Sequence, residues 1–199
     1  MRKRSSGASL IRAVGGTAAV AALAVGMVGS ANASEVRPFA EQARAAGVSE
    51  RQAAALQADI DRRLAGIPRA TQTGFNQISF PEGVTRTFDV PGAPKAAGAP
   101  NCGGGSFCMY ADADYEPPSG HGGTISFWKC GDYDLNNSDY DFLDKATSLH
   151  NNQTAGTYAW AGSRNGGGWD HVYYGPAPYS TPHLGGGSDT ADHVWLCEA

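Results

Sequence analysis

Apolar side chains recur at two different spacings along this 199-residue chain. Between positions 49 and 66 they follow the spacing of one helical face. Ser49 opens this run with a capping box to Gln52, and Gly66 ends it. The apolar positions are Ala53, Leu56, Ile60 and Leu64. The pattern predicts an amphipathic helix here, preceded by a shorter helix over 39–46.

After the helix the spacing changes to the alternation of strands. The runs FNQISF and VTRTFDV flank Pro-Glu-Gly, which predicts a β-hairpin over 75–90. Beyond residue 100 there are short aromatic and β-branched runs between Gly, Pro, Asn and Asp clusters, with no helical period. These runs are FCMYA, GTISFWKC, GTYAWAG, DHVYYG and HVWLC. They predict an all-β domain, a small Greek-key sandwich or barrel filled by aromatic side chains.

Composition divides the chain at the same place. Residues 34–100 contain no Trp, Tyr or Cys, whereas 101–199 contain all four Trp, all eight Tyr and all four Cys. The intervening PGAPKAAGAP (91–100) favours neither helix nor strand and is typical of an exposed linker. We expect 34–90 to be a leader segment, either a cleavable pro-segment or a passive spacer, followed by a domain over 101–199.

The first 33 residues have the pattern of a signal peptide. Four basic residues up to Arg12 precede an uncharged, Ala- and Gly-rich run that ends in Ala-Asn-Ala. The run is barely long enough for a hydrocarbon core about 30 Å thick, so a membrane-spanning helix is the weaker interpretation. We expect cleavage after Ala33, a secreted, extracellular protein, and no membrane association after cleavage.

Charge excludes a general nucleic-acid binder. Segment 34–100 has eight basic and seven acidic residues, and 101–199 has three basic and twelve acidic, a net charge of -9. Phosphate binding needs a surplus of Lys and Arg on one face, which this domain lacks.

The cysteines predict two disulfides. Cys102, Cys108, Cys130 and Cys197 form an even set in an exported segment. A zinc site is the weaker alternative, because the spacings match no zinc module. Four cysteines allow three pairings that the sequence does not separate; we expect Cys108 with Cys130 on neighbouring strands, and Cys102 with Cys197 between the domain's ends.

Catalytic patterns are weak. The five histidines are scattered without a metal-ligand spacing, and no G-x-S-x-G elbow is present. The pairs Asp170-His171 and Asp192-His193 are more typical of surface or strand-end residues than of catalytic dyads. An aromatic strip for sugar stacking is an alternative to simple core packing for Trp160, Trp169, Tyr173, Tyr174 and Tyr179. We therefore expect no enzyme.

Three runs together carry a resemblance to a known family. They are NCGGGSFCMYADADY, GGTISFWKCGDYD and FLDKATSLHNNQTAGTYAWAG, followed by the terminal VWLC. Over residues 101–199 the chain resembles the secreted bacterial peptidase inhibitors whose founding members inhibit metalloproteases. The resemblance implies a βγ-crystallin-like double Greek-key sandwich, with pseudo-twofold halves near 103–150 and 155–197.

The resemblance also suggests a calcium motif. In that superfamily two Asn/Asp residues precede two free positions and Ser/Thr-Ser, and 143–148 (LDKATS) matches except for Leu143. The candidate ligands are Asp144, Thr147 and Ser148, which serve as turn hydrogen bonders in the alternative interpretation. The second repeat, 188–193, fits worse. No cofactor is required.

The expected function is inhibition of an extracellular peptidase, a metallopeptidase first, by a rigid disulfide-stapled loop that blocks the active site. A preorganised loop lowers the entropic cost of binding. The candidate loops are 113–123 and 177–187, which contain prolines that restrict the backbone. No reactive residue is assigned. The alternatives are a calcium- or surface-binding module and a small hydrolase.

Overall fold

The computed structural model describes residues 36–92, 98–115, 122–165 and 167–198. The expected signal peptide and its cleavage site lie outside these residues. Two helices precede eleven strands in the described part: α1 (Val36–Ala45), α2 (Glu50–Gly66), β1 (Thr71–Gly74), β2 (Gln77–Phe80), β3 (Val84–Thr87), β4 (Ser106–Tyr110), β5 (Thr124–Phe127), β6 (Gly131–Asp134), β7 (Ser148–Asn152), β8 (Tyr158–Asn165), β9 (Gly168–Pro176), β10 (Tyr179–Thr181) and β11 (His193–Glu198). Short 3-10 turns cover Ala113–Tyr115 and Gly185–Gly187.

The predicted long helix is confirmed, with its cap. The Gln52 amide donates to the Ser49 hydroxyl (3.4 Å), and the Ser49 amide donates to the Gln52 side chain (3.1 Å). Leu56 and Ile60 are buried and join a core cluster with the side chains of β2 and β3. No helix in the described part of the chain is long and apolar enough to cross a membrane.

The strands form two antiparallel sheets. Sheet A has the order β1-β2-β3-β5-β4-β7-β10, and sheet B has the order β6-β11-β8-β9. Strands β4–β7 form one four-strand unit and β8–β11 a second, and the third strand of each unit, β6 or β10, pairs in the other unit's sheet. This exchange is a double Greek key, so the all-β, βγ-crystallin-like fold class expected from the sequence is confirmed.

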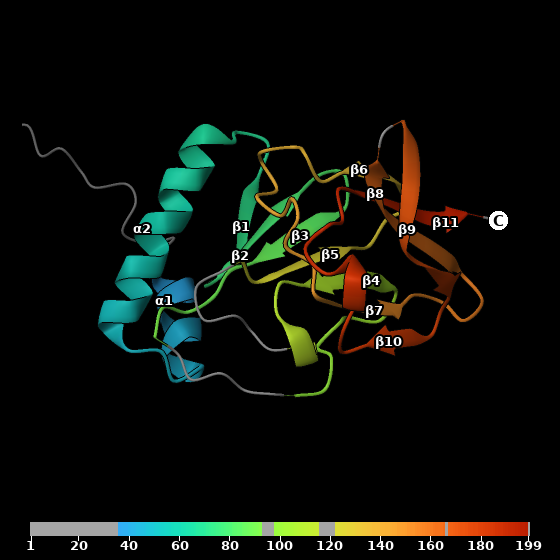
Figure 1. The fold of residues 1–199 in the computed structure, drawn as a ribbon. Coiled ribbons are helices and arrows are strands. Elements are labelled where there is room, and N and C mark those ends of the chain that lie inside the picture. Colours follow the sequence, from blue (N-terminus) through green and yellow to red (C-terminus); the bar gives the residue numbers. More distant parts are fainter. Residues whose placement is uncertain (1–35, 93–97, 116–121, 166, 199) are drawn as a thin grey trace, which may run out of the picture. The chain divides into compact units, whose positions relative to one another are not determined.

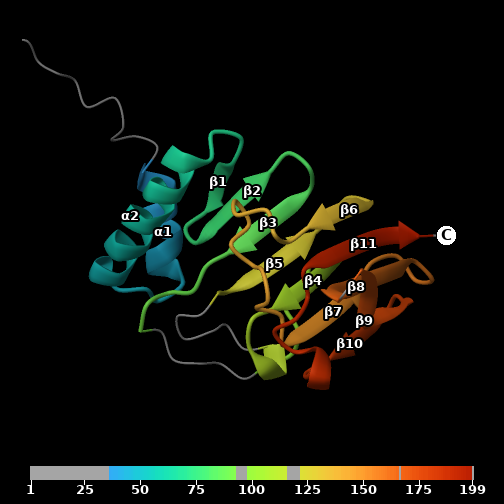
Figure 2. The ribbon, with the colours of Figure 1, turned by 45° about the horizontal axis from the view of Figure 1, so that its top comes forward.

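The predicted hairpin is present, and it joins the domain's own sheet. Strand β3 pairs with β5 over four residues, from Val84 opposite Phe127 to Thr87 opposite Thr124. Figures 1 and 2 show α1 and α2 beside the β1–β3 end of sheet A, with the strands of sheet B at its other end. Residues on both sides of the 91–100 segment therefore share one sheet and one core.

Four strands were not expected from the sequence: β1, β6, β7 and β10. Strand β7 is the clearest case, because SLHNN is polar and yet lies between β4 and β10 inside sheet A. Its Leu149 enters the core, and its Asn151 is fully buried. The Asn151 amide reaches the Tyr173 hydroxyl and the carbonyls of Thr157 and Gly175, each at 3.4 Å. A buried polar side chain is tolerated here because its donors have partners.

Candidate functional site

The turns of the double Greek key gather at two opposite ends of its strands. We call one the disulfide end; it consists of the turns 102–105, 128–130 and 153–157. The other, the acidic end, consists of the segments 111–115, 135–147 and 182–192. The expected calcium ligands fall mainly at the acidic end, together with the described residues of the 113–123 loop and residues 182–187 of the other proline loop. The cysteines fall at the disulfide end, and Ala177 of the second proline loop bonds the 153–157 turn there.

The two disulfides join Cys102 to Cys108 and Cys130 to Cys197, with Cα–Cα distances of 5.8 and 5.3 Å. The expected pairing of Cys108 with Cys130 and of Cys102 with Cys197 is therefore wrong. Strand register gives the physical reason. Cys108 lies opposite Ser126 on β5, four residues before Cys130, so those two sulfurs cannot meet.

Register also explains the observed second bridge. Leu196 of β11 lies opposite Gly131 of β6, which places Cys197 beside the residue that precedes β6. Cys130 therefore bonds Cys197 and ties the turn between β5 and β6 to the end of β11. The first bridge spans only six positions and closes the glycine-rich turn 103–105. Two disulfides are consistent with an extracellular protein.

The 128–130 turn carries an exposed aromatic side chain on a fixed backbone. Trp128 is 47% exposed, and its amide donates to the carbonyl oxygen of Gly83 (2.9 Å). The Tyr133 hydroxyl donates to the carbonyl of Lys129 (2.8 Å), and the disulfide of Cys130 anchors the turn to Cys197 on β11. The backbone of this turn is thus held on both sides while the indole remains open to solvent.

Lys129 ties the same turn to the leader hairpin. Its ammonium group donates to the carbonyl of Pro81 (2.6 Å) and lies 4.8 Å from the centre of the Trp128 ring. The Lys129 stem packs against Gly83, where an added Cβ would lie 2.7 Å from the Lys129 Cβ. The turn between β2 and β3 therefore supports the 128–130 turn directly.

At the acidic end the three calcium candidates make hydrogen bonds within the turns. The Ser148 hydroxyl donates to the carbonyl of Asp112 (2.7 Å), and the Thr147 hydroxyl donates to Asp189 Oδ1 (3.2 Å). Asp144 donates its amide to the carbonyl of Ala191 (3.3 Å). Burial, and the charges of Asp192 and Asp189, raise the pKa of Asp144.

The turns of the two repeats meet as a pair. The amide of Asp144 reaches Ala191, and in return the amide of Asp189 donates to the carbonyl of Ala146 (2.8 Å). Both aspartates have positive φ, 51° and 56°. In the described residues, no three acidic, histidine or cysteine side chains form a group that could hold a metal ion. Two buried carboxylate oxygens, Asp112 Oδ2 and Asp192 Oδ1, lack a hydrogen-bond partner among those residues.

The two candidate inhibitory loops are only partly loops in the described structure. Much of 113–123 lies outside the described residues, and 177–187 contains strand β10, which pairs with β7 from Tyr179 opposite Asn151 to Thr181 opposite Leu149. The remaining parts touch each other, because the Asp114 amide donates to the Pro182 carbonyl (3.0 Å). No disulfide lies at this end in the described part of the chain.

The five residues of the expected aromatic strip do not share one surface: Tyr179 lies on β10 of sheet A, and the other four divide between the two faces of sheet B. Tyr173 faces the core and stacks on Phe107 at 5.9 Å, so it packs the core. Trp160 and Trp169 instead pack against Trp195, which was not among the five residues expected to form the strip. The centres of these three rings lie 4.7 to 5.6 Å apart. Trp160 itself is 5% exposed, which leaves little of its ring for a sugar.

The histidines near aspartates have other partners. The Trp160 indole donates to His171 Nδ1 (2.9 Å), and His193 pairs with Asp132 across the sheet. The carboxylate of Asp192 accepts a hydrogen bond from the backbone amide of Arg164 (2.8 Å). In these contacts each histidine and each aspartate of the two neighbouring pairs bonds a residue outside its own pair.

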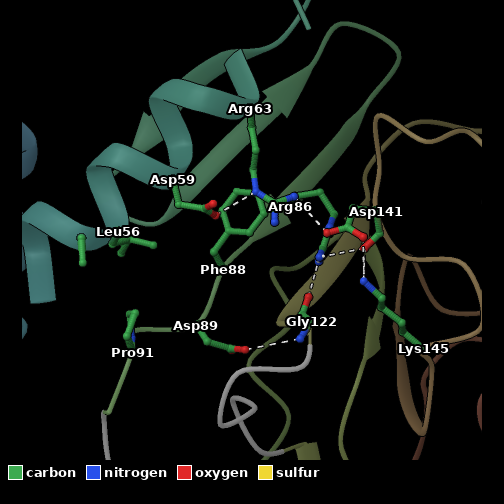
Figure 3. A pocket seen from close by; sticks show the side chains of 11 residues that line it. Leu56, Asp59, Arg63, Arg86, Phe88, Asp89, Pro91, Gly122, Asp141 and Lys145 are labelled. Carbon is green, nitrogen blue, oxygen red and sulfur yellow. Dashed lines mark hydrogen bonds and ion pairs between the residues drawn. The ribbon is translucent and has the colours of Figure 1, made fainter. Parts of the chain in front are cut away.

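A cavity of about 430 Å³ lies between α2 and the domain (Figure 3). Its charged groups are already paired. Arg63 bonds Asp59 and Asp141, each at 2.9 Å, and Lys145 bonds Asp141 at 2.7 Å. Lys145 and Arg63 hold the pKa of Asp141 below its ordinary value, although burial alone would raise it. The cavity therefore offers no unpaired group of either charge among these four.

Comparisons with known proteins give no family for this chain. No family model matches the sequence, and no curated protein matches it. One solved structure, from work on the "Evolution of the eye lens beta-gamma-crystallin domain fold", is similar at 12% identity with a TM-score of 0.39, over 53% of this chain and 97% of that chain. The fold assignment rests on the strand order of the two sheets.

Proposed function

We propose that the protein is a secreted inhibitor of an extracellular peptidase, foremost a metallopeptidase, and that the 128–130 turn enters the active-site cleft. The observation that carries the proposal is the exposed Trp128 on a backbone fixed by a disulfide. Tryptophan is enriched among the residues that dominate protein–protein binding energy. A turn that is already ordered loses little entropy when it binds.

The choice of a peptidase rests on the sequence resemblance of residues 101–199. The net charge of -9 over that range favours encounter with a positively charged partner. The location of both disulfides at one end supports that end, rather than the proline loops, as the contact surface. The proposal needs neither a catalytic group nor a cofactor in this chain.

The test is a titration of residues 34–199 against a thermolysin-like metallopeptidase and a subtilisin-like serine peptidase of known active concentration. We expect activity of one class to fall linearly to zero near a 1:1 ratio, with the inhibitor intact or singly nicked on a gel. Unchanged activity of both classes, or progressive degradation of the chain, would overturn the proposal.

A second candidate is a calcium-binding module, favoured by the unpartnered oxygens of Asp112 and Asp192. A cation would supply these buried oxygens with the partner they lack. Millimolar calcium would then raise the melting temperature by several degrees, magnesium much less, and Asp112→Asn would abolish the rise. An unchanged melting temperature would eliminate this candidate.

A further inference from the structure

The leader segment supplies an inner strand to the domain's sheet. Strand β3 lies between β2 and β5, so without it β5 would be an exposed sheet edge. An unpaired edge strand is a common cause of aggregation, which natural proteins avoid by covering the edge. The leader thus covers a surface that the domain by itself would leave open.

A buried arginine from β3 enters the domain. Arg86 is 1% exposed, and its guanidinium donates to four backbone carbonyls: those of Tyr140 (2.7 Å), Thr124 (2.7 Å), Asp141 (3.3 Å) and Gly122. All four belong to residues beyond position 100. Burial lowers the pKa of Arg86 to about 9, so the side chain remains charged at neutral pH.

Removing the leader would strip these carbonyls of their donor. A buried carbonyl without a partner is costly, and so is a buried guanidinium without acceptors, so each segment satisfies the other. The Arg63 and Arg86 side chains both lie beside the Phe88 ring (Figure 3). Their guanidinium carbons are 4.7 and 5.4 Å from the centre of that ring. Arg63 also forms an ion pair with Asp141 of the domain.

Two glycines permit the close approach of β3 and β5, one at each end of their ladder. A Cβ on Gly123, which has φ of +67°, would lie 1.8 Å from the carbonyl oxygen of Thr87. A Cβ on Gly83, which has φ of +100°, would lie 2.6 Å from the Cγ of the Lys129 side chain. The domain residue Gly123 therefore has a backbone shaped to accept the leader strand.

We propose that residues 34–90 are a permanent strand donor to 101–199, so that a chain cut within 91–100 persists as a 1:1 non-covalent pair. No disulfide joins the two segments, because all four cysteines lie beyond residue 100. The inference is independent of the proposed inhibition.

The test uses the 34–199 chain with residues 93–97 replaced by the recognition sequence of a specific endoprotease. After complete cleavage the fragments should elute together on size exclusion and give the mass of a 1:1 complex in native mass spectrometry. Arg86→Met should raise the dissociation constant of the cut pair at least tenfold. The matched control is Arg62→Met in α2, whose side chain is 73% exposed and bonds Asp59 of its own segment.

A leader fragment that separates without denaturant, while 101–199 keeps its melting temperature, would overturn the proposal. Hydrogen exchange on the uncut chain provides a second measurement if Arg86→Met fails to fold. The amides that link β3 to β5 should be protected as strongly as those that link β4 to β5. Exchange of the β3–β5 amides at least a hundredfold faster would show that the leader opens independently and would also contradict the proposal.

Discussion

The two ends of the double Greek key are held in shape by different means. At the disulfide end, covalent bonds and the leader hairpin fix the 128–130 turn, and the exposed group is the aromatic ring of Trp128. At the acidic end, hydrogen bonds between Asp144, Asp189 and neighbouring carbonyls join the turns. The difference suggests a rigid contact surface at the first end and an ion-sensitive surface at the second.

The largest expected effect comes from opening the long disulfide loop. Replacing Cys130 and Cys197 by Ser frees a loop of 67 residues, which costs about 4 kcal/mol in the chain-entropy model. Replacing Cys102 and Cys108 frees a loop of six and costs about 2 kcal/mol. Urea unfolding of both double variants measures which of them loses more free energy of unfolding. Equal losses, or the reverse order, would contradict this account of the disulfide end.

A smaller effect is expected from a glycine near the acidic end. In Gly123→Ala the new Cβ would lie on a backbone with positive φ and would clash with the Thr87 carbonyl. We therefore expect the free energy of unfolding to fall by about 3 kcal/mol. Its control is Gly105→Ala at the disulfide end, where φ is +82° and an added Cβ meets nothing within 4 Å. That change should cost only about 1 kcal/mol of backbone strain. Similar unfolding free energies for both variants would show that β3 does not approach β5 closely.

The smallest effects concern two carboxyls with opposite shifts. Burial would raise the pKa of Glu82, but hydrogen bonds from Tyr140 and its own amide, and Arg69, lower it overall. Glu82 therefore stabilises the fold above its unfolded pKa and loses this effect as the pH falls through its folded pKa. The pKa of Asp144 is raised, so its charged form destabilises the fold increasingly as the pH rises through that value.

These signs predict that Glu82→Gln lowers and Asp144→Asn raises the free energy of unfolding at neutral pH. Solvent screening limits the Asp144 effect to a few tenths of a kcal/mol. Each difference should shrink as the pH falls through the folded pKa of its carboxyl, which is lowered for Glu82 and raised for Asp144, so the Asp144 difference disappears at the higher pH. Denaturant titrations at neutral pH and at successively lower pH values measure them. If both variants changed the free energy of unfolding in the same direction, the expected electrostatic difference between Glu82 in the hairpin and Asp144 at the acidic end would be contradicted.

Local sequence patterns predicted the elements whose stabilising contacts are local. The capping box of α2 and the turn of the 75–90 hairpin depend on residues close in sequence, and both are present. Strand β7 was missed because the burial of Asn151 depends on Tyr173 and Gly175, more than twenty residues away. Apolar patterning contains no information about such partners.

The site was predictable only in part, for the same reason. The sequence identified the four cysteines, but their pairing follows from the register of β6 with β11 and of β4 with β5. Trp128 was included in a strand run, and its exposure depends on β5 ending at Phe127. The cluster of Trp160, Trp169 and Trp195 joins three strands that no local pattern brings together.

The most direct test of the central claim is the peptidase titration repeated with Trp128→Ala. Tyr174→Ala is the control, because Tyr174 is 56% exposed on β9, in the other sheet. We predict that the inhibition constant rises at least a hundredfold for Trp128→Ala and less than threefold for Tyr174→Ala, with both variants folded by circular dichroism. Undiminished inhibition by Trp128→Ala would contradict the claim that the 128–130 turn enters the cleft.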